Sequence, residues 1–322
     1  MFMKPIQLLA GSEGLEPHLD AKLPIGSAPG MLIQADQIDG SPQPTLALLG
    51  PESEPTYHVV LAPKRGSRPT GANSSYDDPL GIDVVRQRGQ SFFLYSILET
   101  LILLLANPFP YAKDCATWAF LGVQMVRQLA GSRDQQCLRK LFHVMFTLSE
   151  QMPHAIFGFN AVAGNSLERL HFVSHTPALE IGLYAVQRLA ADMQARQRSP
   201  VCVLGPGNGY PLEVVRFGSQ PWSGSVDAAV AFVARLHALG EQWTFNAAVA
   251  VEEGLPVLYV APRDSSLRPA GWPAQFGFME ILGVAVASDL TIVERVRDNT
   301  FTHGDWVRAL SSLRLPSVRH LV

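Results

Sequence analysis

An apolar run, SFFLYSILETLILLLA from Ser91 to Ala106, constrains the fold of this chain more than any other segment. It is shorter than the roughly 20 residues that a membrane-spanning helix needs, and Glu99 stands near its middle. The run therefore predicts a buried sheet or a core helix, and the residue types from Phe92 to Leu105 are compatible with β structure. Hydrophobic residues make up 47% of the chain and charged residues 16%, which suffices for a large core and excludes a disordered or fibrous protein.

Charge and cysteine content exclude several classes of protein. The formal net charge is -3 and the basic residues are scattered, which argues against nucleic acid as a partner. Three cysteines without paired spacing fit neither a disulfide framework nor a zinc ribbon, and they favour a reducing, cytoplasmic setting. Pro5 and Gln7 interrupt the apolar residues at the N-terminus, so we expect no signal peptide. We also expect no membrane partner.

Turn signals and apolar spacing divide the first part of the chain. The first 90 residues are dense in Pro, Gly and Ser, and their short apolar bursts predict short strands and turns. Between Ala116 and Met152 the apolar residues recur at helical spacing, in TWAFLGVQMVRQLAG and DQQCLRKLFHVMFTLSEQM, which predicts two amphipathic helices. A further helix ends in a basic, proline-terminated linker, and we place a domain boundary there, near Arg198.

A second unit follows this boundary. In order, we expect a strand (PLEVVRF), a helix (SVDAAVAFVARLHALGEQW), a hairpin (TFNAAVAVEEGLPVLYVAP), a strand (FMEILGVAVA) and a terminal helix that opens at Thr302. Because 322 residues exceed what one core usually supports, we expect two domains, 1–198 and 199–322. Both halves read as α+β, with antiparallel sheets and helices packed on them.

The stretch NAVAGNSLERLHFVSH, which begins at Asn160, is the best candidate for a reactive site. A strand leads into a loop in which Gly164 lets backbone amides approach a ligand, and Asn160, Asn165 and Ser166 add short donors suited to phosphate oxygens. His171, on the following strand, could then attack phosphorus. The residues alone leave a second interpretation open, in which His171 is an ordinary half-buried histidine.

The run GNSLERLHFV resembles the signature of the histidine triad superfamily, in which Gly-x-Ser precedes a strand bearing His-x-His-x-His, or His-x-His-x-Gln in the galactose-1-phosphate uridylyltransferase branch. Upstream, LANPFPYAKD and FGFNAVAG resemble segments of the same branch. In the second half, TFNAAVAVEEGLPVLYVAPR and GFMEILGVAVASDL are similar to the second repeat of nucleotide-sugar phosphorylases. The resemblance implies two repeats of a histidine-triad-like α+β fold.

The resemblance also implies roles for particular residues. His171 occupies the position of the central histidine, which in the family attacks phosphorus and forms a covalent nucleotidyl-histidine. The phosphate-cradling loop corresponds to Gly164, Asn165 and Ser166, and the upstream amide to Asn160. In the second repeat, Arg263 is placed like an arginine that can face the ligand, although such a residue is more often a rim residue.

The sequence departs from the family pattern at several positions. Arg169 stands where the first histidine is expected, and Val173 stands where the last histidine or glutamine should be. Leu46 and Leu49 occupy positions at which many relatives have a zinc-binding Cys-x-x-Cys pair, so we predict no structural zinc. Arg169 could offer a fixed cation to a phosphate instead. The opposite interpretation is that the loss of a positioned acid or donor lowers nucleotidyl transfer about 10²- to 10⁴-fold and leaves His171 as a relic.

His175 lies four residues beyond His171, and strand alternation predicts that both side chains share one face. A two-histidine metal site there would lack a third ligand in the sequence, so we predict no metal and no cofactor.

The resemblance implies a nucleotidyl or phosphoryl transferase, or a phosphorylase, that acts on a nucleotide or sugar phosphate through His171. Two alternatives fit the altered motif as well. The first is a binding protein that kept the fold and lost the chemistry. The second is an enzyme of a specialised pathway that uses His171 as a general acid or base. Relatives often form dimers, so the resemblance allows a homodimer.

Overall fold

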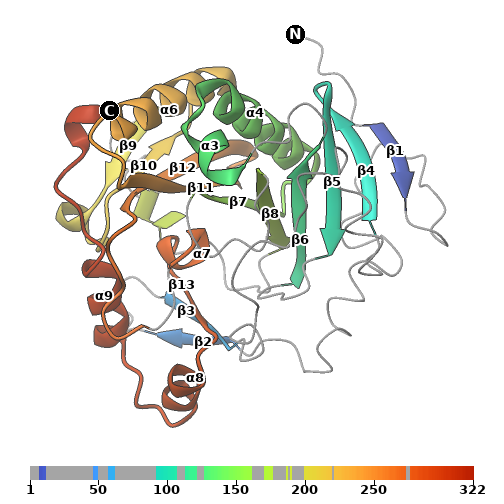
Figure 1. The fold of residues 1–322 in the computed structure, drawn as a ribbon. Coiled ribbons are helices and arrows are strands. Elements are labelled where there is room, and N and C mark those ends of the chain that lie inside the picture. Colours follow the sequence, from blue (N-terminus) through green and yellow to red (C-terminus); the bar gives the residue numbers. More distant parts are fainter. Residues whose placement is uncertain are drawn as a thin grey trace.

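The computed structural model describes residues 7–11, 46–49, 57–61, 92–106, 113–121, 127–161, 170–176, 186–187, 189–190, 199–219, 221–272 and 276–322. A ten-stranded sheet dominates this part of the chain, with the strand order β1-β4-β5-β6-β8-β7-β11-β12-β10-β9 (Figure 1). Every neighbouring pair in it is antiparallel. Its strands are β1 (Gln7–Gly11), β4 (Phe92–Ile97), β5 (Thr100–Ala106), β6 (Lys113–Phe120), β7 (Ile156–Asn160), β8 (His171–Thr176), β9 (Val201–Leu204), β10 (Val214–Phe217), β11 (Trp243–Glu252) and β12 (Leu255–Asp264).

Two halves of this sheet repeat the same motif. From the central pair outwards, β7, β8, β6 and β5 follow one another in one direction, and β11, β12, β10 and β9 in the other. In chain order each set reads strand, strand, helix, strand, strand, with α4 (Gln135–Gln151) in the first set and α6 (Trp222–His237) in the second. A pseudo-two-fold axis through the β7–β11 pair relates the two sets of elements. The boundary after residue 198 stays a prediction, because the sheet continues across both halves.

One face of the sheet is covered by helices. The long helices α4 and α6 lie side by side on it, with the short α3 (Gln128–Arg133) beside them (Figure 1). Phe142 and Phe146 of α4 are fully buried, as are Val230 and Phe232 of α6. They form one apolar core with the sheet side chains that point towards these helices, such as Trp118 and Phe172. This burial supplies the main driving force for holding the two halves together.

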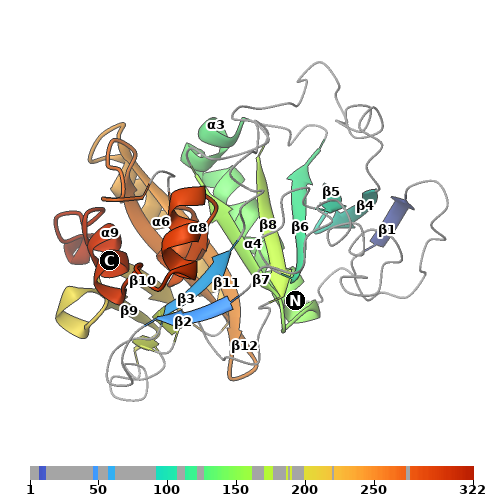
Figure 2. The same cartoon turned by 90° about the horizontal axis from the view of Figure 1, so that it is seen from below.

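The other face carries a second layer and a second core. A small sheet with the order β13-β3-β2 lies there, and α8 and α9 lie on the same side, as Figure 2 shows. Tyr57, Trp306 and Phe278 are buried in this second core. Its elements are β2 (Leu46–Leu49), β3 (Tyr57–Leu61), α7 (Phe278–Ile281), β13 (Val284–Ala287), α8 (Leu290–Arg297) and α9 (His303–Ser311). Two short 3₁₀ turns complete the described elements, η3 (Pro206–Asn208) and η4 (Arg319–Leu321).

The structure confirms the α+β fold with antiparallel sheets and packed helices, and it corrects two local predictions. The segment from Ala116 to Phe120 belongs to strand β6, so the helix that its apolar spacing predicts does not form there. The segment FMEILGVAVA divides into helix α7 and strand β13 and is not a single strand. None of the helices in the described ranges is long and apolar enough to cross a membrane.

Candidate functional site

The candidate site lies at one end of the neighbouring strands β7 and β8, where β7 stops and β8 starts. Asn160 is the last residue of β7, and His171 is the first residue of β8. The two strands pair with Ile156 opposite His175 and Gly158 opposite Val173. The same register, continued to the strand ends, sets Asn160 opposite His171 with both side chains on one face. Because adjacent strands are about 4.8 Å apart, this continued register would place the two side chains beside each other.

The alternation of β8 determines which way His171 points. Phe172 stacks on Trp118 with ring centroids 6.0 Å apart, and Ser174 Oγ accepts a hydrogen bond of 2.7 Å from Trp118 Nε1. Both side chains therefore belong to the core beneath α4 and α6. His171, Val173 and His175 face the opposite layer, which confirms the predicted shared face. The exposed fraction of His171 is 6%, so its ring is almost enclosed within the fold.

Asn160 is held by two donors. Asn246 Nδ2 donates a hydrogen bond of 2.7 Å to Asn160 Oδ1, and the backbone N–H of Phe278 donates a second bond of 2.8 Å to the same oxygen. Asn246 lies on β11, directly opposite Asn160 in the ladder. The carboxylate of Glu280 accepts a hydrogen bond of 2.8 Å from the Gly277 N–H, which fixes the first turn of α7 over the amide pair.

Arg263, on β12, lies at the far end of this amide chain. Its Nη1 donates to Asn246 Oδ1 at 3.3 Å and to the Phe276 carbonyl oxygen at 2.6 Å. The side chain is buried, and desolvation lowers the pKa of Arg263 to about 10, although the negative charge of Glu280 opposes that shift. A guanidinium with this pKa is still protonated at neutral pH. The structure thus brings Arg263 and Asn160 together through Asn246.

His175 lies deeper on the same strand. Its side chain is fully buried, its ring lies 5.8 Å from that of Phe278, and desolvation lowers its pKa to about 3. The imidazole is therefore neutral at physiological pH. Within the ranges that the structure describes, no three His, Cys, Asp or Glu side chains come together in a group that could hold a metal ion.

Four of the predicted site residues lie outside the described residues: Gly164, Asn165, Ser166 and Arg169. Their grouping around the ring of His171 stays a prediction. The chain leaves β7 at Asn160 and returns at His171, so the predicted loop starts and ends beside these two side chains.

Asn246 is the site residue that the sequence interpretation missed. The tripeptide Phe-Asn-Ala occurs at 159–161 and again at 245–247, and this repetition was the available signal. In the structure the two tripeptides face each other, because Asn160 pairs with Asn246 and the Ala161 N–H donates to the Phe245 carbonyl oxygen at 3.2 Å. The pseudo-two-fold axis therefore passes between the two asparagines.

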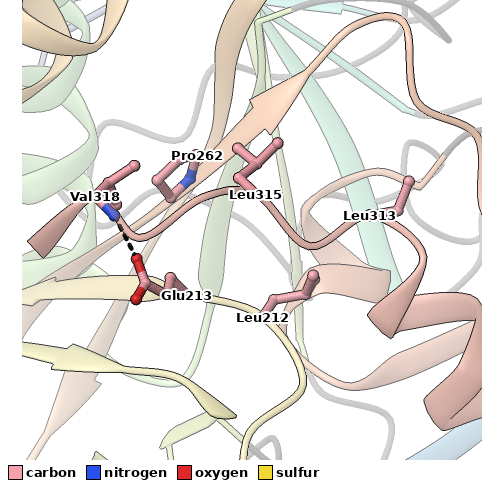
Figure 3. A pocket seen from close by; sticks show the side chains of 6 residues that line it. All are labelled: Leu212, Glu213, Pro262, Leu313, Leu315 and Val318. Atoms are coloured by element: carbon pink, nitrogen blue, oxygen red, sulfur yellow. Dashed lines mark hydrogen bonds between the residues drawn. The ribbon is translucent and has the colours of Figure 1, made fainter. Parts of the chain in front are cut away.

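A shallow pocket among the described residues lies apart from this site. Figure 3 shows it between β10, β12 and the C-terminal segment, where the Val318 N–H donates to a carboxylate oxygen of Glu213 at 2.7 Å. The other lining residues are all apolar, and they are Leu212, Pro262, Leu313 and Leu315. None of the predicted site residues lines it, so its position gives no support for a ligand there.

The fold of this chain is shared by solved structures of another protein. The solved structures that share it include yeast Ap4A phosphorylase Apa2 in complex with Ap4A, with a TM-score of 0.59 and 11% identity over 88% of this chain and 96% of that chain. The same yeast protein matches without ligand at a TM-score of 0.52 and 13% identity, covering 89% and 93%. Its complex with AMP matches at 0.51 and 13%, covering 89% and 95%. No protein-family model and no curated protein sequence matches this chain.

Proposed function

We propose that this chain binds a nucleotide beside His171 and transfers or cleaves its nucleotidyl or phosphoryl group through that histidine. The observation that carries the proposal is that Asn160 ends β7 and His171 begins β8 at the same end of these two paired strands. The fold supports it, because the yeast phosphorylase that shares this fold over most of both chains was solved with Ap4A and with AMP.

The chemistry requires a neutral imidazole nitrogen that points at phosphorus. In the first step a bond forms between a ring nitrogen of His171 and phosphorus, and the bond from phosphorus to the leaving oxygen breaks with its electron pair. In the second step water or inorganic phosphate attacks phosphorus and releases the histidine. Amide donors aimed at the phosphate oxygens would stabilise the charge that develops in both steps. Asn160 can supply one donor, and Gly164, Asn165, Ser166 and Arg169 would supply the others.

A binding protein without turnover is the second candidate, and Val173 favours it. In the resembled signature this position carries the last histidine or glutamine, whereas Val173 has no hydrogen-bonding side chain and packs against the second core. A protein that lacks this group would still hold a nucleotide while it transferred the nucleotidyl group slowly or not at all.

Intact mass spectrometry separates the two candidates. The protein would be incubated with Ap4A and with a panel of nucleoside diphosphate sugars, then measured for a mass increase of one nucleotidyl group. We expect an adduct that is acid-labile, that is absent in His171→Ala, and that persists in His154→Ala, which replaces an exposed histidine in the turn after α4. Saturable nucleotide binding without an adduct would support the binding protein. If the protein shows no nucleotide binding and forms no adduct, both candidates are refuted.

A further inference from the structure

We propose that residues 314–322 form a strap, latched by Glu213, which docks on a preformed site and opens as one unit while the rest of the described fold stays closed. The strap follows α9 and runs from the second core to the first. Leu313, directly before it, is buried in the second core, whereas Val318 and Leu321 are buried in the first. The end of the chain thus joins the two layers.

Glu213, directly before β10, receives three groups of the strap. Its Oε1 accepts a hydrogen bond of 2.8 Å from Ser317 Oγ, and its Oε2 accepts one of 2.7 Å from the Val318 N–H, which Figure 3 shows beside the shallow pocket. Arg319 Nε lies 3.7 Å from Oε1, but its side chain is more than half exposed, so this ion pair adds little. Two charge-assisted hydrogen bonds to a largely buried carboxylate therefore hold the strap closed.

Two further side chains hold the end of the strap. Asn208 Oδ1 accepts a hydrogen bond of 3.2 Å from Arg319 Nη2, and Arg235 Nε, on α6, donates to the Leu321 carbonyl oxygen at 2.7 Å. Between described residues, the backbone–backbone hydrogen bonds of the strap stay within the strap and the last turn of α9. Because no strand ladder among these residues ties the strap to the sheet, it can detach by breaking a few side-chain contacts.

The docking site is held by contacts that do not involve the strap. The Gly205 carbonyl oxygen accepts from the Asn208 N–H at 2.8 Å and from the Tyr210 N–H at 3.1 Å, which closes the turn η3. Tyr210 is fully buried, and its hydroxyl donates to the Ile281 carbonyl oxygen at the end of α7. A Cβ on Gly205 would lie 3.1 Å from Glu213 Cγ, so a glycine there lets the latch lie against the turn. The site therefore keeps its shape when the strap leaves.

Opening of the strap is unfavourable but local. Val318 is 1% exposed and Leu321 is 7% exposed, so opening transfers two apolar side chains into water. The ladders of β10 with β12 and of β11 with β12 contain no residue of the strap, and they persist when it detaches. The open state is therefore a minor population that the chain reaches without global unfolding.

Native-state hydrogen exchange of the full chain measures this opening. The amides of Val318 and Leu321 would be followed by mass spectrometry at increasing urea below the global transition, with the β11–β12 hairpin as internal reference. We expect the strap amides to exchange at least about tenfold faster than the hairpin, at a rate that changes little with urea, because a local opening exposes little surface. If the strap exchanges at the rate of the hairpin and with the same steep dependence on urea, it opens only by global unfolding and the proposal is wrong.

Variants at Glu213 test the latch. Glu213→Ala removes both acceptors, so the strap amides should exchange about 10- to 100-fold faster while the hairpin is unchanged. Glu213→Gln keeps one acceptor for the Val318 N–H and should lie between the wild type and Glu213→Ala. Glu294→Ala, which removes an exposed carboxylate from α8, is the matched control and should exchange like the wild type. If Glu213→Ala does not fold, Ser317→Ala, at an exposed position, takes its place with an expected increase of about 3- to 10-fold.

Two results with these variants would overturn the proposal. If the strap of Glu213→Ala, or of its substitute Ser317→Ala, exchanges no faster than that of Glu294→Ala, Glu213 is not the latch. If Glu213→Ala accelerates the strap and the hairpin by equal factors, Glu213 stabilises the whole fold and the strap is not a separate unit. None of these measurements uses a nucleotide, so the strap and the proposed function are tested independently, and either can fail while the other stands.

Discussion

The ring of Phe278 occupies the space that a side chain at position 158 would need. A Cβ built on Gly158 would lie 2.2 Å from two carbons of that ring, far inside van der Waals contact. Gly158 lies in the middle of β7, and Phe278 opens α7 and donates its backbone N–H to Asn160. The absence of a side chain at this position is what allows α7 to rest on the sheet beside the candidate site.

Gly158→Ala should therefore destabilise the protein by about 1–3 kcal/mol, because the ring of Phe278 cannot move aside without shifting α7. The change would be measured as the free energy of unfolding in urea. Gly207→Ala is a matched control, since a Cβ at that exposed turn meets nothing within 4 Å. Equal losses in the two variants would show that the contact with Phe278 is not the cause.

A buried ion pair in the second half gives another prediction. Arg216 donates to Glu252 from Nε at 3.1 Å and from Nη2 at 2.9 Å, and Tyr259 Oη donates to the same carboxylate. Glu252→Gln keeps the shape but leaves the charge of Arg216 buried without a counter-ion, so we expect a loss of about 3–5 kcal/mol in the free energy of unfolding. The adjacent Glu253→Gln, at an exposed turn, should change it by less than about 0.5 kcal/mol.

The buried ring of His175 predicts a pH dependence of stability. Its pKa is lowered from 6.5 to about 3 in the fold, so the unfolded chain binds a proton that the folded chain does not. This contribution is present above pH 6.5 and is lost as the pH falls towards 3, with a slope of up to about 1.4 kcal/mol per pH unit.

His175→Phe tests this prediction, because phenylalanine fills a similar volume next to Phe278 and cannot take up a proton. Urea midpoints at pH 7 and pH 5 should fall less in the variant than in the wild type. His154→Gln, at an exposed position, should retain the wild-type slope. An unchanged slope in His175→Phe would mean that the ring is already protonated or accessible in the folded protein.

Helix α9 begins with a reciprocal cap. Thr302 Oγ1 accepts from the Asp305 N–H at 3.2 Å, and the Asp305 carboxylate accepts from the Thr302 N–H at 3.0 Å. Thr302→Ala should lower the free energy of unfolding by about 1 kcal/mol, whereas Thr302→Ser, which retains the hydroxyl, should stay close to the wild type. Thermal midpoints of both variants would check this, and a serine variant as unstable as the alanine variant would contradict it.

The sequence predicts those helices and hairpins whose residue patterns lie within one short segment of the chain. The sequence predicts a hairpin, which the structure forms from β11 and β12, and a terminal helix that opens at Thr302, which is α9. Trp118 and Phe120 misled the helical interpretation, because aromatic residues two apart also fit a strand with one buried face. In β6 they face the helical layer, while Cys115 packs in the second core.

Long-range pairing is what the sequence could not show. Strand β13 pairs in parallel with β3, and Val284 meets His58 across more than two hundred residues of chain. No local pattern encodes that contact. The candidate site also depends on long-range pairing. His171 and Asn160 lie in one stretch of sequence, whereas Asn246 and Phe278 reach Asn160 only through the arrangement of the sheet.

The shared ladder between β7 and β11 means that the halves depend on one another. Separating the chain between them would strip the hydrogen-bonding partner from β11, a strand of ten residues, and leave a long bare edge. Such a fragment would aggregate or pair with a second copy of itself. The ladder that joins the two halves thus also works against any form of this protein that carries one half alone.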